Sequence, residues 1–146
     1  MGVERRLQEM KDRDGDGFWR ARPNLAAPGV SKHGGRGLIA LCTIDSGAII
    51  DRACTVEIDE SQSAPLDQMR PLGDYYFAHP DNPRAGLMAY GLMVLCNHAD
   101  PANADIIWWK SPTLGWMADL VARVDIAPGE EITFRYRCPL WFEPAT

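Results

Sequence analysis

Residues 93–103 read M-V-L-C-N-H-A-D-P-A-N, so an apolar run ends abruptly in an asparagine and a histidine. The run brings the backbone into the core, and Asn97 and His98 arrive together at its edge. Asparagine offers two hydrogen-bond donors and an acceptor, and histidine offers one of each. Buried groups of this kind need partners. Either the stretch closes a turn through its own side chains, as Asn and Asp commonly do, or it helps to bind a ligand.

The size and charge of the chain narrow the classes of function. With 146 residues, 46% apolar and 24% charged, the composition is that of one globular domain. A net charge of −5 argues against general nucleic-acid binding, which usually needs a basic face, and it permits a basic partner such as a lysine-bearing peptide. The first residues lack the apolar region of a secretory signal, and no apolar run approaches the ~18 residues of a membrane helix. We therefore expect a cytoplasmic protein that contacts neither membrane nor nucleic acid directly.

Two features of the sequence bear on metal binding, and neither supports it. Four cysteines lie far apart without C-x-x-C spacing, namely Cys42, Cys54, Cys96 and Cys138. This spacing disfavours zinc, and free thiols are the expectation in the cytosol. Residues 12–17, D-R-D-G-D-G, match the opening of a calcium loop, but Pro23 stands where the bidentate Glu is needed. A solvated acidic linker is the better interpretation of this segment.

The apolar pattern predicts a mainly β fold with few short helices. Residues 3–11 have the spacing of a short amphipathic helix. Beyond them, short β-branched runs punctuated by Gly and Pro are typical of strands. The expected strands are residues 37–44, 48–58, 105–110, 116–124 and 132–136. Residues 59–74 are expected to form a loop or short helix, and residues 86–96 are an apolar segment compatible with a helix.

Three motifs occur in a fixed order along the chain. Residues 35–40, G-R-G-L-I-A, precede I-D-S-G-A-I-I at 44–50; C-N-H-A-D-P-A-N-A occupies 96–104; and D-I-A-P-G-E-E-I-T-F-R-Y occupies 125–136. In this order the chain resembles the SET-domain protein-lysine methyltransferases, and D-Y-Y-F-A at 74–78 is similar to an aromatic segment of their small bacterial members. The cysteine-rich zinc tail that many eukaryotic members carry is absent from the sequence. The chain is identified as a member of the small bacterial type.

The resemblance implies a domain division and a fold. Residues 31–142 would form the SET domain, after an N-terminal helix and linker extension at 1–30 and before a tail at 143–146. The implied fold is β-clip-like, with short strands and a C-terminal pseudoknot that brings residues 97–103 beside Tyr136.

The resemblance also implies an activity, the transfer of a methyl group from S-adenosylmethionine to a lysine of a protein substrate, without a metal. S-adenosylhomocysteine would be the product. Such an enzyme works mostly by aligning amine, methyl and sulfur, and an apolar channel favours the neutral amine. The oligomeric state implied is a monomer or a homodimer.

Site residues follow from the motifs position by position. Tyr136 matches the catalytic tyrosine. Asn97 would bind the amino-acid end of the methionine, and His98 would offer its backbone to the adenine while its ring packs structurally. The other residues expected at the cofactor are Gly35, Arg36, Gly37 and Trp141, and the candidates for the lysine channel are Tyr76, Phe77 and Tyr90.

Two departures from the family pattern motivate an alternative function. The serine of the second motif is Ala99 here, and its P-N has become P-A-N. The alternative is a SET-like module that binds a protein or peptide without catalysis. Three tryptophans on expected strands, Trp108, Trp109 and Trp116, are interpreted as core or surface residues rather than site residues.

Overall fold

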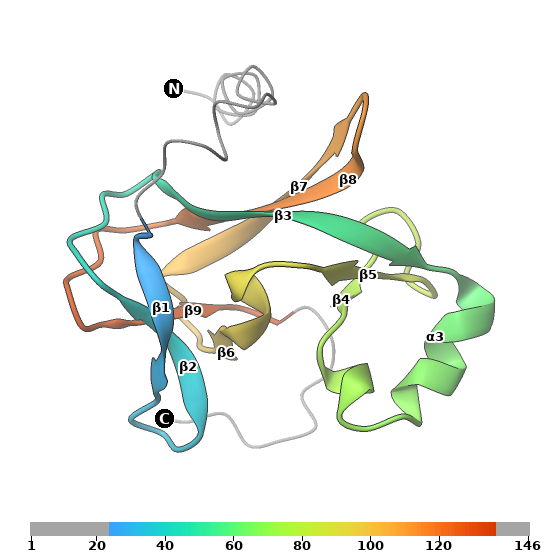
Figure 1. The fold of residues 1–146 in the computed structure, drawn as a ribbon, viewed down its shortest axis with the longest axis horizontal. Helices are drawn as coiled ribbons and strands as arrows, with labels where there is room; N and C mark the ends of the chain where they lie inside the picture. The colour runs from blue at the N-terminus through green and yellow to red at the C-terminus, as the bar shows by residue number, and fades with distance from the viewer. Residues whose placement is uncertain (1–23, 137–146) are drawn as a thin grey trace.

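A computed structural model of the chain describes residues 24–136. Its regular secondary structure is mainly β-strand, with one α-helix and two 3-10 helices among the described residues (Figure 1). The strands are β1 Ala26–Val30, β2 Arg36–Ala40, β3 Ile49–Ile58, β4 Phe77–Ala78, β5 Gly86–Ala89, β6 Asn97–His98, β7 Ala104–Ser111, β8 Gly115–Ala122 and β9 Glu131–Phe134. The helices are α3 Glu60–Asp67, η1 Leu72–Asp74 and η2 Leu92–Leu95. The predicted mainly β class is confirmed.

The strands form two sheets, one in the order β1-β2-β9-β6 and one in the order β4-β5-β3-β8-β7. All pairings are antiparallel except that of β6 with β9, which sets Asn97 beside Thr133 and His98 beside Phe134. This parallel pair joins the second motif to the third, as the predicted pseudoknot requires. The C-terminal segment of that pseudoknot lies outside the described residues.

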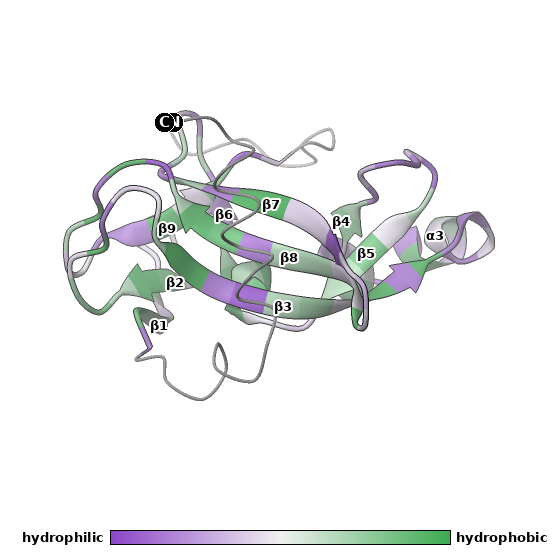
Figure 2. Cartoon of the chain, turned by 90° about the horizontal axis from the view of Figure 1, so that it is seen from above, coloured by the Kyte–Doolittle hydropathy of each residue, from purple (hydrophilic) through white to green (hydrophobic). Residues whose placement is uncertain are grey.

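The core lies between the sheets and is apolar along the central strands (Figure 2). Leu38, Met93, Leu120 and Ile132 have no exposed surface. Burial extends over both faces of β8 from Met117 to Ala122, whereas an antiparallel strand with one solvated face alternates apolar with polar residues. Strand β8 is therefore the most enclosed strand of the larger sheet.

A buried ion pair interrupts the apolar pattern of β3 and β8. Arg52 and Asp119 face each other in the register of these strands. They are joined by hydrogen bonds of 2.7 and 2.8 Å, and their side chains are 1% and 0% exposed. The guanidinium carbon of Arg52 lies 5.0 Å from the ring centroid of Trp109, which is itself buried. Trp109 is thus a core residue, as expected.

Two segments differ from or refine the sequence interpretation. Residues 86–96 form strand β5 and the 3-10 helix η2 rather than one helix, because Gly91 between them is fully extended and β5 pairs with β3. An apolar run alone does not distinguish a buried strand from a helix. The polar segment after β3 does form a helix, α3, which a capping box between Asp59 and Gln62 begins.

The smaller sheet begins before the SET boundary proposed at residue 31. Strand β1 pairs with β2 from Ala26 opposite Ala40 to Val30 opposite Arg36, so residues assigned to the N-terminal extension belong to this sheet. The helix expected at 3–11 and the acidic segment at 12–17 lie outside the described residues.

Candidate active site

Tyr136 follows β9 and is held against β6 by two hydrogen bonds. Its backbone N–H donates to Nδ1 of His98 at 3.0 Å, and its hydroxyl donates to the carbonyl oxygen of Cys96 at 2.9 Å. The rings of Tyr136 and His98 meet edge to face, with centroids 5.3 Å apart. Because Nδ1 of His98 accepts a backbone hydrogen bond, this nitrogen carries no proton. The imidazole therefore acts as a structural support for Tyr136.

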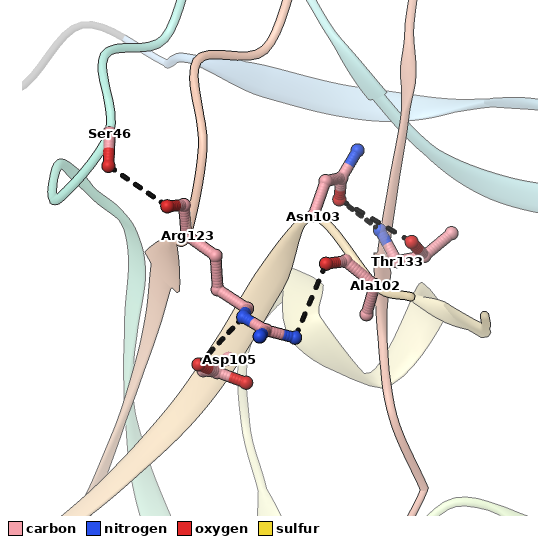
Figure 3. A network of polar contacts seen from close by, with 6 residues as sticks. All are labelled: Ser46, Ala102, Asn103, Asp105, Arg123 and Thr133. Carbon is pink, nitrogen blue, oxygen red and sulfur yellow. Dashed lines mark hydrogen bonds and ion pairs between the residues drawn. The ribbon is translucent and has the colours of Figure 1, made fainter. Parts of the chain in front are cut away.

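Asn103 fastens the loop after β6 to strand β9 (Figure 3). Its Nδ2 donates to the carbonyl oxygen of Glu131 at 2.8 Å, and its Oδ1 accepts from the N–H of Thr133 at 2.9 Å. The carboxamide thus makes two hydrogen bonds to the backbone of β9, as a neighbouring strand would. This asparagine of P-A-N makes both bonds although one residue, Ala102, separates it from the proline.

A second set of contacts supports the same loop from β8. Arg123 lies between the carbonyl oxygen of Ala102, at 3.5 Å, and the carboxylate of Asp105, at 3.4 Å. Its own carbonyl oxygen accepts from the hydroxyl of Ser46 (Figure 3). The C-terminal end of the loop that carries the second motif is therefore held by contacts with both β9 and Arg123.

The glycines of the first motif serve two different purposes. Gly35 has φ of +70°, a conformation that glycine adopts without steric cost, and nothing lies within 4 Å of the position a Cβ would take. Gly37 lies within β2, and a Cβ there would overlap Oε1 of Glu131 and lie 3.2 Å from Nδ2 of Asn97. Gly37 therefore makes room for a carboxylate, which is a reason that the motif alone did not reveal.

The side chain of Asn97, in the second motif, is hydrogen-bonded to residues of the first and third motifs. Its Nδ2 donates to the carbonyl oxygen of Arg36 at 3.0 Å and to Oε1 of Glu131 at 2.7 Å. The other carboxylate oxygen of Glu131 accepts from the hydroxyl of Ser31 at 2.9 Å. Within residues 24–136, no hydrogen bond reaches Oδ1 of Asn97, so this oxygen is an acceptor available to a ligand.

Arg36 reaches across to the wall of a pocket. Its guanidinium donates to the hydroxyl of Tyr75 at 2.8 Å and lies 5.5 Å from the centroid of that ring. The sequence left open whether Arg36 meets a cofactor carboxylate or solvent. In the structure it joins the start of β2 to the segment after η1.

The pocket has a volume of about 670 Å³ and lies beside Tyr136. Its aromatic walls include Phe77, whose ring centroid is 5.6 Å from those of both Trp108 and Phe134. The other aromatic and apolar residues of the lining that concern the site are Tyr75, Tyr76, Val94, Cys96, Ile106 and Tyr136. The hydroxyl of Tyr76 donates to Asp67 of α3, which fixes this ring at the rim. The expected channel residues Tyr76 and Phe77 thus share one cavity with Tyr136.

Two expected site residues are not brought to this pocket. Tyr90 is 65% exposed, its hydroxyl contacts the sulfur of Met88, and it does not line the cavity. The cause is strand alternation, because Ala89 before it faces the core and the next side chain faces away. Trp141 lies outside the described residues.

Sequence reasoning missed Trp108 as a pocket residue. It lines the cavity beside Phe77, whereas Trp109 is buried on the other face of β7. Adjacent residues of a strand point to opposite faces, so a Trp-Trp pair signals that one ring faces each side. The sequence does not say which of the two rings faces the site.

The sequence predicts free thiols, and three of the four cysteines lie among the described residues. Cys42, Cys54 and Cys96 are free thiols, and burial raises the pKa of Cys96, with further contributions from the charges of Asp51 and Glu131.

In the part of the chain described, no three His, Cys, Asp or Glu side chains are grouped as metal ligands. No helix between residues 24 and 136 is long and apolar enough to cross a membrane.

Comparison with known proteins identifies the family. The SET domain profile matches residues 35–137, which contain all three motifs. The chain belongs to the SET domain family. A comparison with curated proteins finds no match.

Solved structures of similar fold support the assignment. A Plasmodium falciparum protein provisionally assigned as a histone methyltransferase aligns with 26% identity and a TM-score of 0.63, over 83% of this chain and 100% of that chain. The Chaetomium thermophilum Polycomb Repressive Complex 2, in an autoinhibited conformation bound to S-adenosylmethionine, aligns with 20% identity and a TM-score of 0.67, over 92% of this chain and 18% of that chain. A structure of that complex with GSK126 aligns with 21% identity and a TM-score of 0.67, over 92% of this chain and 19% of that chain.

Proposed function

We propose that the protein is an S-adenosylmethionine-dependent methyltransferase that acts on a lysine side chain of a protein substrate. The observation that carries the proposal is the position of Tyr136, whose hydroxyl bonds to Cys96 while its ring lines the pocket beside β6. Membership of the SET domain family supports it, as do a structural neighbour assigned as a histone methyltransferase and another bound to S-adenosylmethionine.

The residues around Asn97 fit the amino-acid end of such a methyl donor. Oδ1 of Asn97 is an acceptor without a donor among the described residues, and it suits an ammonium group. The open space at Gly35 permits close approach to the backbone of the first motif. When bound, S-adenosylmethionine supplies a methyl group on a sulfonium, and S-adenosylhomocysteine remains after transfer.

The pocket on the other side of Tyr136 fits a lysine side chain. Its walls of Phe77, Trp108 and Phe134 would enclose the aliphatic stem and exclude water. Desolvation of an amine lowers its pKa and favours the neutral, nucleophilic form. The aromatic part of the pocket therefore supports methyl transfer by favouring the neutral amine and by positioning it.

Tyr136 is placed to orient the reacting groups rather than to take a proton. Its hydroxyl hydrogen is directed to the carbonyl oxygen of Cys96, so its oxygen offers acceptor lone pairs to the pocket. An oxygen in this state makes weak C–H···O contacts to a methyl group. We therefore assign Tyr136 the task of aligning methyl and amine.

The proposal includes a cellular setting. The substrate is a protein that presents a lysine, and the enzyme works in the cytoplasm as a monomer or homodimer, without direct contact to nucleic acid or membrane. Support comes from the acidic net charge of −5, which favours basic protein partners over nucleic acid.

Thermal melting with and without S-adenosylhomocysteine tests the cofactor part of the proposal. A ligand at 100 times its Kd adds about 2.7 kcal/mol, which for a domain of this size raises Tm by roughly 5–10 °C. We expect this shift in wild type and in Asn24→Ala, an exposed asparagine that does not line the pocket, and its loss in Asn97→Ala. Absence of a shift in wild type would contradict the proposal and favour a SET-like binding module.

A further inference from the structure

We propose that Glu131 is a positioning residue that fixes the side-chain amide of Asn97 for the methyl donor. The inference rests on the proposed function and adds to it a residue outside the expected cofactor set. Glu131 stands second in the E-E pair of the third motif, at the start of β9.

Hydrogen bonds at Asn97 determine which way its carboxamide points. Both hydrogens of Nδ2 are donated, one to the carbonyl oxygen of Arg36 and one to Oε1 of Glu131. If the amide were flipped, Oδ1 would face these two acceptors and both contacts would become repulsive. The carboxylate of Glu131 therefore helps to keep Oδ1 as the group presented to a ligand.

Glu131 is itself held in one position. Its Oε2 accepts from the hydroxyl of Ser31, a residue only 3% exposed. Gly37 provides the space for Oε1, since a Cβ there would overlap this oxygen. The register of β2 with β9 sets Ile39 opposite Glu131, and Gly37, two residues along β2, points to the same face. Two strands and a buried serine thus fix one carboxylate.

The neighbouring acid, Glu130, is a matched control. It is exposed, and its backbone accepts a hydrogen bond from Ala40 and donates one to Ala127. Removing its side chain changes the local charge by the same amount as removing that of Glu131, without touching Asn97.

The test is calorimetric titration of S-adenosylhomocysteine into wild type, Glu131→Ala, Asn97→Ala, the double variant and Glu130→Ala. We expect Glu131→Ala to weaken binding roughly tenfold and Glu130→Ala to bind as wild type does. If Glu131 acts through Asn97, the double variant binds no more weakly than Asn97→Ala alone. Losses that multiply in the double variant would show that Glu131 acts independently of Asn97, and would overturn the inference.

Two further variants separate positioning from a general loss of structure. Glu131→Gln keeps an oxygen for Asn97, and we expect it to recover most of the affinity. Gly37→Ala places a Cβ against Oε1 of Glu131 and 3.2 Å from Nδ2 of Asn97, and we expect it to disturb this pair and weaken binding at an unchanged oligomeric state. Tight binding by wild type that Glu131→Ala does not weaken overturns this inference alone, whereas no binding by wild type overturns the proposed function together with it.

Discussion

The hydroxyl of Tyr136 donates a 2.9 Å hydrogen bond to the carbonyl oxygen of Cys96, the residue that immediately precedes β6. The bond crosses the parallel pair of β6 and β9, which also brings the backbone N–H of Tyr136 to His98. A tyrosine from the third motif is thus oriented by the backbone and imidazole of the second. This arrangement explains why an apolar run, Asn-His and a distant tyrosine occur together in one chain.

Burial of Cys96 predicts an unreactive thiol. Desolvation raises its pKa, and the nearby charges of Asp51 and Glu131 act in the same direction, so little thiolate is present at neutral pH. We expect iodoacetamide to modify the exposed Cys54 of a Cys138→Ser variant while Cys96 stays unmodified in the native state. Mass spectrometry of peptides over time measures this. Equal rates at Cys54 and Cys96 before unfolding would show that the site is more open than described.

The buried ion pair predicts a large difference between two aspartates of the larger sheet. Asp119→Asn removes the charge of the carboxylate that accepts two hydrogen bonds from the buried Arg52, and we expect it to lower the free energy of unfolding by about 3–5 kcal/mol. Asp105→Asn is the control, because its contact with Arg123 is 3.4 Å long and exposed, and such pairs contribute about 0–1 kcal/mol. Urea unfolding of both variants measures the difference. Similar losses from the two changes would refute the assigned role of the buried pair.

Asn103 predicts a local effect on β9. Asn103→Ala removes two hydrogen bonds to the β9 backbone, each contributing about 0.5–1.5 kcal/mol, and frees the N–H of Thr133. We expect faster hydrogen exchange at Thr133 and a decrease in Tm. Asn82→Ala is the control, because it also removes two side-chain hydrogen bonds, to Arg84 and Glu60, and it is expected to leave the exchange at Thr133 unchanged. Unchanged protection of Thr133 in Asn103→Ala would mean that another group holds β9.

The adjacency of the motifs was predictable from the sequence, whereas the side-chain contacts between them were not. Order and spacing of the three motifs indicated a SET fold, and that fold requires residues 97–103 to lie beside Tyr136. The partner of Gly37 was not predictable, because a glycine in a strand signals close approach without naming the approaching group. That group is Glu131, which the sequence presented only as one position of the third motif.

The pocket lining differs from the expected channel residues at Tyr90 and Trp108 for a common reason, which is the direction a side chain takes from a strand. Tyr90 and Phe77 are both aromatic residues near β5, but one faces solvent and the other faces the pocket. Trp108 and Trp109 differ by one residue and lie on opposite faces of β7. Register decides these directions, and register follows from strand pairing rather than from the local sequence.

Trp108 predicts an effect on substrate binding. Trp108→Ala removes one wall of the pocket and its contact with Phe77, so we expect the KM for a lysine-containing peptide to rise roughly tenfold or more, because lost apolar contacts in a binding pocket typically cost ~1–3 kcal/mol. Trp116→Ala is the matched control, because this residue does not line the pocket. The Kd for S-adenosylhomocysteine should be unaffected by either change. A higher Kd for that ligand in Trp108→Ala would place Trp108 at the methyl donor instead.

The measurement that tests the central claim most directly is transfer of a radiolabelled methyl group from S-adenosylmethionine to lysine in a mixture of cellular proteins. Wild type is compared with Tyr136→Phe, in which the ring still packs against His98 and Phe134. We predict labelled lysine with wild type and a rate at least tenfold lower with Tyr136→Phe, about 1.4 kcal/mol or more in the barrier, at unchanged affinity for S-adenosylhomocysteine. Equal rates for the two proteins, or no labelled lysine with a wild type that binds S-adenosylhomocysteine, would contradict the account.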